Sequence, residues 1–182
     1  MSAGPDREEV VERLLAFARS AELDAERGSR GGEVVLVLPG EKKLRTVLSL
    51  VVGERDVSAS AFVVRNPDEN HAEVYRFLLR RNLRTPGLAY AIDAAGDVYV
   101  VGRLPIAALD DDPLDRLLGV VLDAADSCFN DLLALGFLTS IRREWAWRTS
   151  RGESRRNLEA FAHLMEEQGD SQGEGGPPRV EA

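Results

Sequence analysis

Three apolar runs joined by short connections constrain the fold of this chain more than any other feature. The runs cover residues 34–38, 44–52 and 57–64, and the turn-forming stretch GERD joins the last two. Apolar runs this close together favour antiparallel pairing, because parallel strands need a crossover of a dozen or more residues. The sequence therefore predicts an antiparallel sheet in the first half of the chain.

A second hairpin is predicted in the stretch GLAYAIDAAGDVYVVGRLP, which covers residues 87–105. Asp93 and Gly96 begin and end the turn DAAG between two apolar runs, and Pro105 stops the second strand. Asp93, Gly96 and Asp97 supply too few ligands for a calcium site. We therefore expect Gly96 to have a structural role in the turn, and Pro105 to have one at the end of the strand.

Helices are expected where apolar side chains recur at intervals of three and four residues. These segments are residues 6–20, 66–83, 112–135, part of 140–156, and 153–167. Asn66-Pro67 and Asp112-Pro113 each place a capping residue before a proline, which suits the first helical position. The predicted order is helix, three strands, helix, two strands, long helix and a C-terminal helical appendix. This order is typical of an α+β protein with helices packed on an antiparallel sheet, not of a doubly wound α/β fold.

The length of 182 residues suits one domain, which we place at residues 1–167. Residues 168–182 lack core-forming side chains and are predicted to be a disordered acidic tail rich in Gly and Pro. The single cysteine excludes an intrachain disulfide, and no apolar run approaches the ~18 residues of a membrane span. We therefore expect a cytoplasmic protein without membrane contact. Its strong preference for Arg over Lys suggests a high-GC, actinobacterial genome.

Residues suited to catalysis are scarce. His71 and His163 are the only histidines, and no cluster of Cys, His and carboxylates has the spacing of a metal site. Cys128 lies beside Phe129 on an apolar helix and is expected to be a buried, inert thiol. The sequence thus predicts no enzymatic activity, no cofactor and no metal.

The stretch SIRREWAWRTSRGESRR, residues 140–156, contains both tryptophans of the chain among six arginines. On a helix, Trp145 shares a face with Ile141, whereas Trp147 points elsewhere with Arg143 and Arg151. Trp145 is therefore expected to be structural. The candidate partner-binding residues are Arg142, Arg143, Trp147, Arg148 and Arg151.

Three interpretations of this stretch remain open. Both indoles can be buried with the arginine stems reaching outward, or the stretch can bind a protein partner, or it can bind nucleic acid. A net charge of -8 makes nucleic acid unlikely as a partner, because an acidic protein repels phosphates at long range. A regulatory protein that binds a small ligand or nucleic acid through these arginines and through Arg76, Arg80 and Arg84 is the alternative.

Three stretches together resemble the YbjN family, whose members are described as bacterial sensory transduction regulators. These stretches are AYAIDAAGDVYVVGRLP, DRLLGVVLDAADSCFNDLLALGF and IRREWAWR, and the similarity runs from about residue 6 to about residue 165. The family is similar in fold to the class I chaperones of type III secretion, which are usually dimers that hold extended protein segments. The resemblance implies a non-enzymatic, chaperone-like or adaptor protein, a homodimer with a protein client, and it implies no catalytic residues.

Overall fold

The computed structural model describes residues 6–166, which form two compact units divided between Gly136 and Phe137. We call them the N-terminal unit and the C-terminal unit. The single domain expected for residues 1–167 stays a prediction. The tail expected at residues 168–182 lies outside the described residues.

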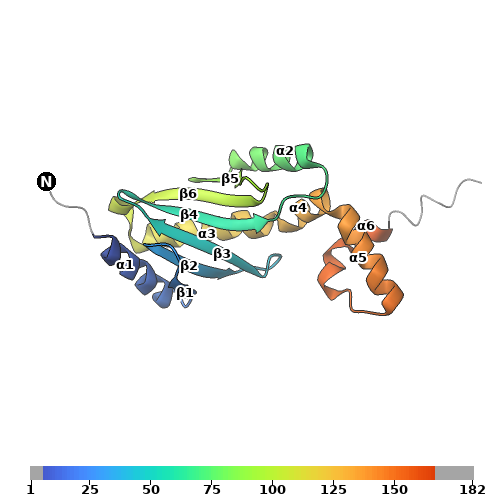
Figure 1. Cartoon of the computed structure of the whole chain (residues 1–182), viewed down its shortest axis with the longest axis horizontal. Coiled ribbons are helices and arrows are strands. Elements are labelled where there is room, and N and C mark those ends of the chain that lie inside the picture. Colours follow the sequence, from blue (N-terminus) through green and yellow to red (C-terminus); the bar gives the residue numbers. More distant parts are fainter. Residues whose placement is uncertain (1–5, 167–182) are drawn as a thin grey trace, which may run out of the picture. The chain divides into compact units, whose positions relative to one another are not determined.

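The N-terminal unit consists of one sheet and its helices (Figure 1). In chain order its elements are α1 (Arg7–Ser20), β1 (Asp24–Arg27), β2 (Glu33–Pro39), β3 (Arg45–Val52), β4 (Asp56–Val64), α2 (His71–Asn82), β5 (Leu88–Ile92), β6 (Val98–Pro105), η1 (Ile106–Ala108), α3 (Asp111–Ser127) and α4 (Phe129–Gly136). The predicted fold class, an antiparallel sheet with helices packed on it, is confirmed.

The six strands lie in the order β1-β2-β3-β4-β6-β5, and every neighbouring pair is antiparallel. Alternate residues share a face, so Leu36, Leu48, Ala61 and Val100 form one buried row across four strands. Helices α1 and α3 pack on this face, and α3 runs behind the sheet in Figure 1. The core of the unit therefore lies between the sheet and these two helices.

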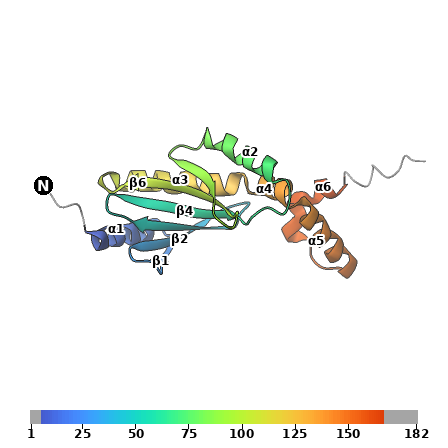
Figure 2. The same cartoon turned by 45° about the horizontal axis from the view of Figure 1, so that its top comes forward.

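Both edges of the sheet are protected against further pairing. At the β5 edge, Tyr90 N donates a hydrogen bond to Asn82 Oδ1 at 2.7 Å, and Asn82 Nδ2 donates to Tyr90 O at 3.4 Å. Helix α2, which also contacts α4, thereby occupies this edge (Figure 2). At the other edge, β1 is short and largely charged, which discourages a further strand from pairing there.

Strand β1 is one element that the sequence analysis missed, since it expected three strands before the second helix. The segment DAER has one apolar residue and no β-branched side chain, so it carries no strand pattern. Pairing with β2 and ion pairs from Arg27 to Glu8 and Glu12 of α1 hold it in place.

The helix predicted over residues 112–135 is divided at Cys128 into α3 and α4. The carbonyl oxygen of Ala124 accepts hydrogen bonds from the Tyr90 hydroxyl at 2.7 Å and from the Cys128 thiol at 3.1 Å. In an unbroken helix this carbonyl would accept the amide of Cys128. Tertiary contacts thus compete with the helix at the point where it breaks.

Two predicted helix starts differ from the structure. Helix α2 begins at His71 after Asn70, and Asn66 instead donates from its side chain to Ala95 O at 2.9 Å. Helix α3 follows Asp110, so Asp112 and Pro113 lie within its first turn and not at its cap and first position. Asp112 there still favours the helix electrostatically.

Gly96 closes the β5–β6 turn at a φ of +86°, and Pro105 ends β6, as the sequence predicts. A Cβ at Gly96 would lie 2.6 Å from Asn66 Cγ. Gly96→Ala should therefore lower the free energy of unfolding by about 1–3 kcal/mol, measured by urea titration. Gly119→Ala is the matched control, because it lies within α3 with nothing within 4 Å of its Cβ position and should add about 1 kcal/mol. Equal effects would contradict the strain at Gly96.

The C-terminal unit contains α5 (Leu138–Arg151), η2 (Arg156–Phe161) and α6 (Ala162–Glu166). Gly152 ends α5 in the left-handed conformation at a φ of +67°. The helix predicted over residues 153–167 is thus split into a short 3-10 helix and a short α-helix, with Leu158 and Phe161 buried.

Candidate protein-binding surfaces

Helix α5 carries an exposed tryptophan. The side chain of Trp147 is 43% exposed and, with Ser140, Arg143 and Glu144, lines a shallow hollow. The guanidinium of Arg151 lies 5.0 Å from the centre of the Trp147 ring, within the range of a cation–π contact. The structure therefore brings Arg143, Trp147 and Arg151 together on one surface, which we call the Trp147 surface.

The other candidate residues of this helix have different surroundings. Arg148 is partly buried; it donates to Glu144 Oε1 at 2.6 Å and to Ser154 O at 2.8 Å, so its charge is already paired. Arg142 Nε is buried and has no hydrogen-bond partner among the described residues. Neither is a free surface cation.

Trp145 is partly buried rather than enclosed in a core. The Arg155 guanidinium lies 4.7 Å from the centre of its ring, and the residue keeps intermediate exposure. Ile141, on the same face of α5, is buried, as the helical spacing predicts. Trp145 thus lies on the inner side of α5 without being fully covered.

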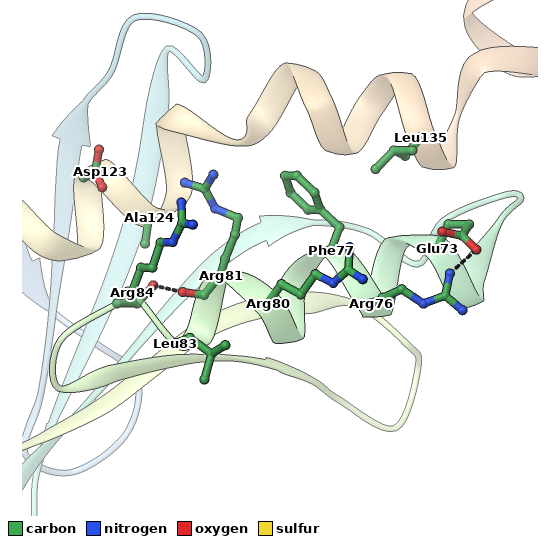
Figure 3. A pocket seen from close by; sticks show the side chains of 11 residues that line it. Glu73, Arg76, Phe77, Arg80, Arg81, Leu83, Arg84, Asp123, Ala124 and Leu135 are labelled. Atoms are coloured by element: carbon green, nitrogen blue, oxygen red, sulfur yellow. Dashed lines mark hydrogen bonds and ion pairs between the residues drawn. The ribbon is translucent and has the colours of Figure 1, made fainter.

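A cleft of about 770 Å³ lies in the N-terminal unit between α2 and the α3–α4 pair. Its lining residues are Glu73, Arg76, Phe77, Arg80, Arg81, Leu83, Arg84, Thr85, Asp123, Ala124 and Leu135. Figure 3 shows Phe77 and Arg81 directed from α2 toward the opposite helices. We call this the α2 cleft.

The α2 cleft is bordered by Arg76, Arg80 and Arg84, three exposed arginines that the sequence analysis offered as part of an alternative binding surface. Arg81 lines the same cleft. Leu83, which also lines the cleft, is 88% exposed. The sequence shows the spacing of these residues, but it does not show which helix lies opposite.

The face of the sheet opposite α1 and α3 is the third surface, and we call it the open sheet face. Its apolar side chains are Val35, Val37, Val47, Val51, Phe62, Tyr99 and Val101. Phe62 and Tyr99 pack edge to face, with ring centres 5.6 Å apart. Exposed apolar patches of this kind are often sites of contact with other proteins.

Cys128, which the sequence analysis expects to be inert, lies in a buried polar cluster at the break between α3 and α4. Its thiol is 3.5 Å from the Tyr90 hydroxyl, and Arg81 Nε donates to that hydroxyl at 3.3 Å. Burial raises the pKa of the Cys128 thiol, so the thiol stays protonated at neutral pH. This environment agrees with the inert thiol expected from the sequence.

Lys43 borders the same cluster, and burial lowers the pKa of its ammonium group to about 8. Since the unfolded chain holds this proton up to about pH 10.5, folding stability gains from Lys43 as pH rises from 8 to 10.5. Lys43→Met should remove this gain. The gain in folding stability is measured from the midpoints of urea unfolding at pH 8 and at pH 10.5. Lys42→Met, in the same loop, is the control. An unchanged pH dependence in Lys43→Met would contradict the assignment.

Among residues 6–166, no group of three or more His, Cys, Asp or Glu side chains is arranged to hold a metal ion. None of the helices within that range is both long and apolar enough to cross a membrane.

Fold and surfaces together define a class: α+β proteins whose helices cover one face of a single antiparallel sheet and leave the other face open. The chain belongs to the YbjN family, described as "Putative bacterial sensory transduction regulator", which matches residues 11–134. The family resemblance inferred from the sequence is thereby confirmed over residues 11–134, whereas the stretch IRREWAWR that was counted toward it lies outside the matched residues.

Relatives in mycobacteria match most of the chain. An uncharacterised protein of Mycobacterium leprae is 55% identical over 137 residues, which are 75% of this chain and 74% of that protein. An uncharacterised protein of Mycobacterium tuberculosis is 57% identical over 131 residues, 72% of each chain. These organisms agree with the actinobacterial origin that the arginine preference suggests.

Solved structures share the fold at low sequence identity. A chain of the ExsC–ExsE complex matches with a TM-score of 0.53 at 19% identity, over 69% of this chain and 95% of that chain. YbjN from E. coli matches with a TM-score of 0.50 at 9% identity, over 65% of this chain and 89% of that chain. The Yersinia pestis type III secretion chaperone SycH, in complex with a fragment of YscM2, also matches over 63% and 95%, at 22% identity. Its TM-score of 0.45 is too low to add to the assignment.

Proposed function

We propose that this protein is a non-enzymatic, chaperone-like adaptor that binds a protein partner, with Arg143, Trp147 and Arg151 as the anchor. The observation that carries the proposal is the exposed indole of Trp147 beside two arginines on α5. Tryptophan and arginine are enriched among the residues that dominate binding energy at protein interfaces. Arg142, whose Nε is buried, and Arg148, which is paired with Glu144, are not included in the anchor.

Two further observations support binding over turnover. The open sheet face presents apolar side chains, and a fold neighbour with a TM-score of 0.53 was solved in the ExsC–ExsE complex. Because β5 is covered by Asn82, a client segment is expected in a helix-flanked groove rather than along that sheet edge. A cytoplasmic location is part of the proposal.

The test is affinity capture of the tagged full chain from a lysate of its own host, at moderate and at high salt, with mass spectrometry of what is retained. One protein retained at both salt concentrations in near-stoichiometric amount is expected. Retention of no protein above the background of an unrelated tagged control would overturn the adaptor function.

Nucleic acid is the partner that the alternative regulatory function requires. Contacts to phosphates release counterions, so such binding falls steeply as salt rises. Nucleic acid retained at moderate salt only, and released at high salt, would favour the alternative. The net charge of -8 and the pairing of Arg148 with Glu144 favour the protein partner.

A homodimer is the expected assembly, and the open sheet face supplies apolar surface for it. Light scattering at high micromolar concentration should give about twice the 20.0 kDa of the chain. Val47→Asp, at an exposed position on that face, should shift the mass toward the monomer. A 20 kDa particle for the unmodified chain would contradict the dimer.

A further inference from the structure

The α2 cleft holds more positive charge than its own carboxylates balance. Four arginines line it, whereas Glu73 and Asp123 are its only acidic residues. Glu73 already pairs with Arg76. Arg81 donates to Ser127 Oγ at 2.6 Å and lies 5.6 Å from the Phe77 ring centre, so it is fixed in place.

Arg80 and Arg84 are the two cations left over. Neither forms a side-chain hydrogen bond or an ion pair with any residue of the described range 6–166. Arg80 lies in the last turn of α2, and Arg84 follows Leu83, the residue that caps the C-terminal end of the helix.

Apolar side chains accompany these arginines. Leu79 is 66% exposed and Leu83, which lines the cleft, is 88% exposed. Exposed leucines one turn apart, next to unpaired guanidinium groups, match a ligand that is both acidic and aliphatic. Leu83 caps the C-terminal end of α2 and directly precedes Arg84, and Figure 3 shows the two side chains pointing in different directions from this end of the helix.

We propose that the α2 cleft binds an acidic, leucine-containing segment of a partner protein, whose carboxylates pair with Arg80 and Arg84 and whose aliphatic side chains pack on Leu83. The inference rests on the proposed protein-binding function and adds the chemistry of the segment that is bound. Charge complementarity selects the acidic groups, because guanidinium forms bidentate hydrogen bonds with carboxylates.

Nucleic acid fits the cleft less well than such a segment. Single-stranded nucleic acids need aromatic faces on which bases can stack. Phe77 is the one aromatic residue that lines this cleft, and the Arg81 guanidinium lies over its ring. The exposed leucines would also contact a charged phosphate backbone unfavourably.

The test measures fluorescence anisotropy of labelled short peptides titrated with the full chain. One peptide carries Glu and Leu at helical spacing, one carries them in alternation, and matched peptides have Gln in place of Glu. We expect saturable binding of at least one acidic peptide, weakened at least about tenfold by the Gln replacement. A single-stranded oligonucleotide is titrated in parallel.

Two variants with the same change of charge locate the site. Arg80→Gln/Arg84→Gln should weaken acidic-peptide binding at least about tenfold, whereas the control Arg19→Gln/Arg45→Gln, at exposed positions outside the cleft, should change it less than about twofold. Leu83→Ser, which alters no charge, should also weaken binding and serves if the double variant does not fold. Equal affinity for the two double variants, no saturable binding, or tighter arginine-dependent binding of the oligonucleotide would overturn the inference.

Lysate capture with the same variants separates this inference from the proposed function. If the unmodified chain captures a partner but binds no acidic peptide, the α2 assignment fails and the adaptor function stands. If peptides bind in an Arg80- and Arg84-dependent way while lysate capture retains nothing, the adaptor function with its Trp147 anchor fails and the chemistry of the cleft stands.

Discussion

Trp147→Ala should weaken partner binding at least about thirtyfold while leaving the melting of the protein nearly unchanged. A thirtyfold loss corresponds to about 2 kcal/mol, the usual threshold for a residue that dominates an interface. The indole is 43% exposed, so its removal leaves no buried cavity. The measurement is titration of the captured partner against wild type and variant.

Trp145→Ala is the matched control for this prediction. Its ring is covered by the Arg155 guanidinium and is only partly buried, so the 3–5 kcal/mol typical of a fully buried ring does not apply. We expect a loss of about 1–2 kcal/mol in stability and little change in partner affinity. If Trp147→Ala alone unfolds the C-terminal unit, both indoles are structural and the Trp147 surface is not an anchor.

Leu48→Ala should lower the free energy of unfolding of the N-terminal unit by about 3–5 kcal/mol. Leu48 is 0% exposed in the middle strand β3 and pairs in register with Leu36 and Ala61 on the buried face. Its truncation leaves a cavity beneath α3 that a close-packed core cannot fill. Urea unfolding should show a lower midpoint with an unchanged slope.

Val47→Ala is the control one residue away on the open sheet face. Val47 is 47% exposed in the single chain, so the loss should stay below about 1 kcal/mol at protein concentrations low enough to dissociate the proposed dimer. Equal losses at the two positions would show that both faces of the sheet are covered in solution.

Intrinsic fluorescence shows which of the two units each variant destabilises. The three tyrosines, Tyr75, Tyr90 and Tyr99, lie in the N-terminal unit, whereas Trp145 and Trp147 lie in the C-terminal unit. Tyrosine emission therefore follows the effect of Leu48→Ala, and emission of the remaining tryptophan follows either tryptophan variant.

The fold was largely predictable because its strands and helices carry strong local patterns. Residues 34–38 and 57–64 lie within the observed strands, and the hairpin turn at Gly96 has the positive φ that glycine tolerates. Strand β1 was not predictable, since a four-residue edge strand of mostly charged side chains has no periodicity to detect.

The surfaces were predictable only in part. Helical spacing placed Trp147 away from Ile141 and beside Arg143, and the structure shows the same arrangement. It did not show that Arg148 pairs with Glu144, or that Arg80 and Arg84 border a cleft. The ion pair depends on the rotamers of Arg148 and Glu144, and the cleft depends on which distant helix lies opposite α2.

The sequence by itself determined the fold class, the main strands and helices apart from β1, and the family. Those properties follow from local periodicity and from motifs, which need no partner elsewhere in the chain. Only the tertiary structure decided where the long helix breaks, that α2 begins after Asn70 and not at Asn66, and which residues face the arginines of α2. The reason is physical: the Tyr90 hydroxyl competes for the Ala124 carbonyl across 34 residues of sequence, and no local pattern records such a contact.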